Sequence, residues 1–65
     1  MTQPHYPQAL LRRLVWETKD LDDLVDLCRL YRELEAQGDI VITYRLKAEV
    51  AVQTRLLVQK QKPNL

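Results

Sequence analysis

The chain offers few side chains that could catalyse a reaction. It contains one cysteine, Cys28, one histidine, His5, and no serine, so a Ser-His-Asp triad is impossible. Cys28 and His5 could in principle form a thiolate–imidazole pair. However, Cys28 lies in the apolar stripe of an expected helix, and unpaired cysteines are usually buried packing residues. We therefore predict that the protein is not an enzyme and uses no cofactor and no small-molecule substrate.

A cluster of aspartates is the only pattern that suggests a metal site, and it consists of Asp20, Asp22, Asp23 and Asp26. A calcium-binding loop needs spaced oxygen ligands around a central glycine, which this segment lacks. A structural zinc site needs about four Cys or His ligands, and the chain has two such residues. We therefore interpret the aspartates as charges that complement the N-terminus of a helix, and we predict no metal site.

The length of 65 residues allows a single small domain, residues 1–65, in which we expect 1–6 and 61–65 to be flexible termini. A domain of this size buries only about 60% of the surface that its unfolded chain exposes. Small folds usually need a disulfide, a metal or a partner chain to compensate. A single cysteine excludes an internal disulfide, so we predict a homo-oligomer, with a well-packed monomer as the alternative.

The cellular compartment is predicted from what the chain lacks. A lone cysteine is typical of a reducing compartment. The segment from Met1 to Pro7 is polar and has no apolar core like that of a secretory signal. No stretch approaches the ~20 apolar residues that span a bilayer. We therefore predict a cytoplasmic protein with no membrane partner.

Two N-terminal helices are predicted from apolar spacing and from end signals. Apolar residues recur at helical spacing over about 7–17 and again over about 20–37. Pro7 suits the first turn of the first helix, where its missing N–H costs nothing. Asp20 is a favourable N-cap for the second helix. Gly38 is the expected end of that helix, because glycine readily adopts the left-handed conformation.

The period of the pattern changes at Ile40. Apolar residues then alternate with mostly polar ones over a long stretch: Ile40, Ile42, Tyr44, Leu46, Ala48, Val50 and Val52. Two-residue alternation and β-branched content both favour a strand. We therefore predict an α+β fold, in which two N-terminal helices precede a long strand or hairpin from residue 40, paired across a homodimer.

This prediction has a difficulty, because no Gly, Pro, Asn or Asp occurs between Asp39 and Pro63. A tight hairpin normally needs such residues. Three interpretations remain, and we rank them in this order. The segment is one long strand paired with a second copy, a hairpin with an unusual turn near residues 45–48, or a strand that becomes a helix around Lys47. The last interpretation draws on the good helix formers in this segment.

The leading hypothesis for function is a small protein–protein interaction module, such as an adaptor, inhibitor or assembly factor, that acts as a homodimer and binds another protein. The homodimer would pair the segment from residue 40 across chains. The apolar face of the second helix would serve the core and the partner surface. The expected interface residues are apolar or aromatic: Trp16, Leu24, Leu27, Tyr31, Leu34, Ile42, Tyr44, Leu46 and Val50.

The alternative hypothesis is a small nucleic-acid-binding regulator. The polar face of the predicted strand and the residues after it carry basic side chains: Arg45, Lys47, Arg55, Lys60 and Lys62. Such a face could lie against a phosphate backbone. Glu49 interrupts the row, and no aromatic residue is interleaved for base stacking. We therefore favour a protein partner, and a steep salt dependence of nucleic-acid binding would favour the alternative.

Overall fold

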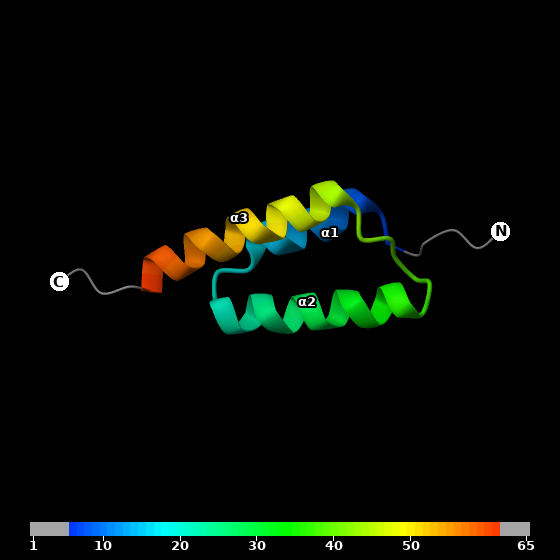
Figure 1. Cartoon of the computed structure of the whole chain (residues 1–65), viewed down its shortest axis with the longest axis horizontal. Coiled ribbons are helices and arrows are strands. Elements are labelled where there is room, and N and C mark those ends of the chain that lie inside the picture. Colours follow the sequence, from blue (N-terminus) through cyan, green and yellow to red (C-terminus); the bar gives the residue numbers. More distant parts are fainter. Residues whose placement is uncertain (1–5, 62–65) are drawn as a thin grey trace.

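The computed structural model describes residues 6–61, and within that range it contains three α-helices and no β-strand. Helix α1 spans Gln8–Glu17, α2 spans Leu21–Ala36 and α3 spans Tyr44–Gln61. Figure 1 shows α1 and α3 side by side and running in the same direction, whereas α2 runs antiparallel to both. Apart from Tyr6 and Gln61, the predicted flexible termini 1–6 and 61–65 lie outside the described residues.

The first two predicted helices are confirmed, and Pro7 lies one residue before the first helix rather than within its first turn. Pro7 is the N-cap of α1, with φ of −68° and ψ of 148°. The side chain of Asp20 caps α2 by accepting hydrogen bonds from the backbone N–H groups of Asp22 at 2.8 Å and Asp23 at 3.4 Å. Because the first N–H groups of a helix have no partner within the helix, these bonds stabilise the first turn.

Helix α2 ends at the predicted glycine. Gly38 has a φ of +82°, and its N–H donates to the carbonyl of Glu35 at 3.0 Å. The N–H of Asp39 donates to the carbonyl of Leu34 at 2.9 Å. This pair of bonds is the Schellman motif, which satisfies the last helical carbonyls and turns the chain. Ile40 follows directly and is buried, so the turn also delivers an apolar side chain to the core.

The predicted strand or hairpin from residue 40 is wrong, and with it the α+β fold class. Residues 40–43 form an irregular connection, and the chain is helical from Tyr44 to Gln61. The alternating apolar residues divide between two environments. Leu46 is buried and Val50 is half-buried, whereas Tyr44 and Val52 are 87% and 50% exposed. The good helix formers of this segment therefore agree with the observed helix. Its two-residue alternation of apolar residues does not.

A buried polar residue explains why the helical period of α3 is hard to detect in the sequence. The inward positions of α3 are Leu46, Val50, Gln53 and Leu57, at the spacing of one helix face. Gln53 breaks the apolar stripe, although it is only 4% exposed. Its side-chain amide donates to the carbonyl of Thr18 at 2.7 Å. The polar group is therefore tolerated in the core because it bonds to the backbone at the end of α1.

The start of α3 depends on a residue that we did not predict as a cap. Thr43 Oγ1 accepts a hydrogen bond from the backbone N–H of Leu46 at 3.1 Å, which is the geometry of an N-cap. Gln8, at the start of α1, bonds to the same connection through the carbonyl of Val41 at 2.6 Å and through Thr43 Oγ1 at 3.3 Å. These contacts place the first turn of α3 beside the first turn of α1.

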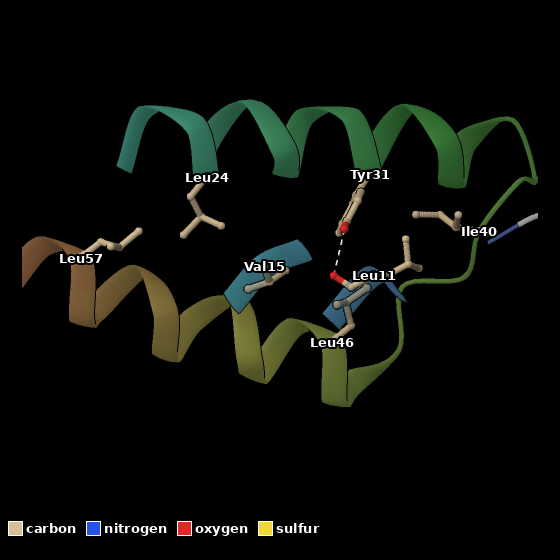
Figure 2. Packing of buried hydrophobic residues seen from close by; sticks show 7 residues of the cluster. All are labelled: Leu11, Val15, Leu24, Tyr31, Ile40, Leu46 and Leu57. Atoms are coloured by element: carbon tan, nitrogen blue, oxygen red, sulfur yellow. Dashed lines mark hydrogen bonds between the residues drawn. The ribbon is translucent and has the colours of Figure 1, made fainter. Parts of the chain in front are cut away.

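The core lies between the three helices and draws on all of them. Its buried apolar residues are Leu11, Val15, Leu24, Tyr31, Ile40, Leu46 and Leu57. Figure 2 shows Tyr31 reaching across from α2, where its hydroxyl donates to the carbonyl of Leu11 at 2.9 Å. Burial raises the pKa of Tyr31 to about 12, and the nearby Cys28 adds to the rise. The phenol therefore stays protonated and keeps this bond at physiological pH.

The homodimer that we predicted through strand pairing is not compatible with this fold. No strand edge exists within residues 6–61, so the described chain has no unpaired ladder of backbone groups for a second copy to complete. Self-association through residues 6–61 would have to use helix faces or the connections between them.

Candidate functional site

Most of the predicted interface residues lie in or against the core of a single chain. Leu24, Tyr31 and Leu46 are buried, and Leu27, Leu34, Ile42 and Val50 pack against them. Trp16 is half-buried, whereas Tyr44 stands apart at 87% exposed. Burial within one chain accounts for the apolar character of seven of these nine residues. A surface that binds another molecule must therefore be sought among the residues that the core leaves uncovered.

An open groove separates α2 from α3. One hollow of about 230 Å³ is lined by apolar side chains together with Arg32 and Lys47, and these apolar residues are Cys28, Tyr31, Ile42, Leu46 and Val50. A second hollow of about 200 Å³ adds Leu21, Leu24, Val25, Arg29 and Thr54. Cys28 and Arg32 line both hollows, so the two are neighbours along α2. We call the whole feature the α2–α3 groove.

Figure 1 shows that α3 continues beyond the end of α1. A third hollow, of about 430 Å³, is lined by residues from the last part of α3 and from the end of α1. Its apolar lining comes from Trp16, Leu56 and Leu57. Its other lining residues are all polar or charged: Lys19, Gln53, Gln59 and Lys60. Although it is larger than either part of the α2–α3 groove, it offers a smaller share of apolar lining to a partner.

A cluster around Glu49 joins α1 to α3. The Trp16 indole Nε1–H donates to Glu49 Oε1 at 2.6 Å. Glu49 Oε2 lies 3.5 Å from Nε of Arg12 and 3.2 Å from Nε of Arg45. The hydrogen bond from Trp16, supported by the two guanidinium groups, lowers the pKa of Glu49 below its usual value. Glu49, the only acidic residue after Asp39 in the sequence, thus serves as an anchor between helices.

This cluster predicts an acid-dependent loss of stability. A carboxylate whose pKa is lowered by folding stabilises the folded state above the pKa of the unfolded chain, about 4.3, and loses that contribution as pH falls through the folded-state value. We expect Glu49→Gln to lower the free energy of unfolding at about pH 7, and we expect its difference from wild type to be smaller at about pH 3. Urea unfolding followed by circular dichroism measures both values.

The matched control is Glu17→Gln, which removes a surface ion pair between Glu17 and Arg13 at 3.0 Å. Exposed pairs of this kind contribute about 0 to 1 kcal/mol, so this variant should follow wild type at both pH values. A constant difference between Glu49→Gln and wild type across the pH range would show that Glu49 contributes through packing rather than through its charge.

Cys28 is half-buried on the floor of the α2–α3 groove. Burial raises the pKa of its thiol, and this effect outweighs the nearby Arg32, which lowers it. The thiolate is the nucleophilic form of cysteine, so this environment disfavours covalent chemistry. His5, the other member of the pair considered from the sequence, lies outside the described residues.

The basic residues of the nucleic-acid hypothesis do not share a face. A strand would align Arg45, Lys47 and Arg55, but a helix turns by about 100° per residue. Arg45 and Lys47 therefore point in directions about 160° apart around α3. Arg45 is also paired with Glu49, and Lys47 lines the α2–α3 groove. Lys60 lines the hollow beyond α1, and Lys62 lies outside the described residues.

Several groove residues were missed by the sequence analysis, among them Val25, Arg29, Arg32 and Thr54. The structure places Arg29 of α2 beside the groove. A helical pattern for residues 44–61 would have provided the missing signal, because Lys47, Val50 and Thr54 then fall on one side of the helix.

No protein-family model, curated protein or solved structure that was compared with the chain matches it. None of the three helices within residues 6–61 is long and apolar enough to cross a membrane. In the same part of the chain, no three His, Cys, Asp or Glu side chains are grouped so that they could hold a metal ion. The groove and its surrounding charges are therefore the features from which a function can be argued.

Proposed function

We propose that the protein is a small, non-enzymatic protein–protein interaction module that binds a helical segment of its partner in the α2–α3 groove. The supporting observation is the apolar floor of that groove, which remains open to solvent within the described chain. Apolar surface that a small fold leaves uncovered commonly marks a binding site. A groove between two helices suits an amphipathic helix, whose apolar side chains recur every three or four residues.

The dimensions of the groove agree with such an occupant. Leu21 and Arg32 mark its extent along α2, and a rise of 1.5 Å per residue makes this distance about 16 Å. That length corresponds to about three turns of a bound helix. We also propose that the protein acts in the cytoplasm, because its single cysteine fits a reducing compartment.

A display selection of helical peptides of about 12 to 16 residues tests this proposal. The full-length chain is the bait, and the enriched peptides are then titrated against Val50→Ala and Val52→Ala. Val50 lines the groove, whereas Val52 lies on α3 but does not line it. Loss of two methyl groups from the floor should weaken binding about tenfold, and Val52→Ala should bind as wild type does.

Failure to enrich any helical peptide would contradict the proposal, as would peptides whose affinity is unchanged by Val50→Ala. Sedimentation of the wild-type chain identifies the other occupant that the sequence suggested, a second copy. A homodimer that Val50→Ala weakens and Val52→Ala does not would assign the groove to self-association.

A further inference from the structure

The cations that line the α2–α3 groove form no close ion pair with another described residue. Among the described residues, the cations that form ion pairs within 4 Å are Arg12, Arg13 and Arg45. None of these ion pairs engages the three cations that line the groove, Arg29, Arg32 and Lys47. No carboxylate belongs to the lining of either hollow in this part of the chain. The lining of the groove therefore combines an apolar floor with three cations and no carboxylate.

The three cations also lie on both sides of the groove. Arg29 and Arg32 belong to α2, whereas Lys47 belongs to α3. A helix seated on the apolar floor would therefore have basic side chains along both flanks. Opposite charges across an interface favour the matching partner and exclude partners of like charge. The arrangement suits a helix whose flanks are acidic and opposes one whose flanks are basic.

We propose that the partner of the α2–α3 groove is an acidic amphipathic helix of another protein. Its apolar residues would contact the floor formed by Cys28, Ile42 and Val50, and its Glu or Asp residues would pair with Arg29, Arg32 and Lys47. The charge of the occupant matters only if the groove binds a helix, so this inference rests on the proposed function.

A second copy of the chain matches this description poorly. Helix α2 carries exposed carboxylates at Asp22, Asp26 and Glu33, which could meet the basic groove of a neighbour. However, the apolar stripe of α2 is already directed into its own core through Leu24 and Tyr31. Helix α2 of a second copy would thus offer acidic side chains without the apolar stripe that the floor of the groove requires.

The test compares two synthetic helical peptides of about 15 residues with the same leucine stripe. One has glutamate on both flanks and the other has lysine. Fluorescence anisotropy measures the binding of each labelled peptide to the full-length chain. We expect the acidic peptide to bind about tenfold more tightly, as three partly exposed charge pairs would produce, and we expect this preference to decrease as salt is added.

The triple variant Arg29→Glu, Arg32→Glu, Lys47→Glu should reverse the preference. All three residues are exposed, so the fold should tolerate the change. The matched control is Arg13→Glu, Arg55→Glu, Lys60→Glu, which changes the net charge equally at exposed residues that do not line the groove. The control should still prefer the acidic peptide, although its larger negative charge weakens binding overall.

The outcomes separate this inference from the proposed function. Equal binding of both peptides, with loss on Val50→Ala, would retain the helix-binding groove and overturn the acidic partner. Failure of both peptides and of the display selection would overturn both proposals. Equally tight binding of polyglutamate or of a mixed-sequence oligonucleotide would identify a general anion-binding surface instead. A wild-type homodimer that the triple variant dissociates would make a second copy the occupant.

Discussion

Replacing Leu46 by aspartate should unfold the chain at neutral pH. Leu46 is 1% exposed and belongs to the core shared by all three helices. Truncating a buried leucine to alanine costs about 2 to 5 kcal/mol, and burying a carboxylate in its place costs more. A protein of this length has a total stability of about 3 to 10 kcal/mol. The substitution therefore removes most or all of the free energy of unfolding.

Val52→Asp is the control for this experiment, because it introduces the same charge into the same helix. Val52 is 50% exposed, so its replacement changes helix propensity and charge without burying a carboxylate. Circular dichroism at 222 nm, a wavelength that reports helix content, should show loss of helix for Leu46→Asp and retention for Val52→Asp. A Leu46→Asp chain with the helix content and urea midpoint of Val52→Asp would contradict the observed core.

Gln53→Glu should produce the second-largest effect, although the two side chains have nearly the same shape. Gln53 Nε2 donates to the carbonyl of Thr18 at 2.7 Å and to that of Trp16 at 3.5 Å. A carboxylate at this position would face two acceptors without a proton to donate. Leaving a buried charge without compensation costs about 3 to 5 kcal/mol, so the variant should be severely destabilised at neutral pH.

The pH dependence of this variant should oppose that expected from Glu49. Burial raises the folded-state pKa of the introduced carboxyl. Relative to wild type, stability is therefore recovered below the unfolded-state pKa of about 4.3 and lost as pH rises through the folded-state value. Urea unfolding of Gln53→Glu and of the exposed control Gln59→Glu measures the difference. Equal stability of the two variants at neutral pH would show that Gln53 has no structural hydrogen bond.

The first two helices could be predicted from the sequence because their signals are local. Asp20 and Gly38 act on the few residues beside them, through the first N–H groups and the last carbonyls of α2. The apolar face that contains Leu24 and Tyr31 has the period of a helix over sixteen consecutive residues. Neither the capping residues nor the helical period depends on the fold of the rest of the chain.

The third helix was wrongly predicted as a strand or hairpin, because its segment carries two periods. Tyr44, Leu46, Ala48, Val50 and Val52 alternate as in a strand. Leu46, Val50 and Leu57 also follow a helical stripe, but Gln53 interrupts it. Gln53 belongs to that stripe only because the carbonyl of Thr18, thirty-five residues away, accepts its hydrogen bond. A local sequence pattern cannot identify a hydrogen-bond partner so far away in the sequence.

The candidate site divides in the same way. Some of its residues could be predicted from the sequence. The apolar character of Ile42, Leu46 and Val50 indicated that they would be covered, either by the core or by a partner. Their assembly into a groove with Arg29 and Arg32 depends on the packing of α3 against α2. The strand prediction instead placed Lys47 in a row with Arg45 and Arg55, a row that the turn of a helix disperses.

The sequence by itself determined where α2 begins and ends and how poor the chain is in side chains for nucleophilic catalysis. Those properties depend on residue identity and on near neighbours. Only the tertiary structure decided that residues 44–61 are helical, that Gln53 is buried and that a basic, apolar groove stays open. The burial of any face requires a partner surface elsewhere in the chain, and that surface exists only when the three helices have packed together.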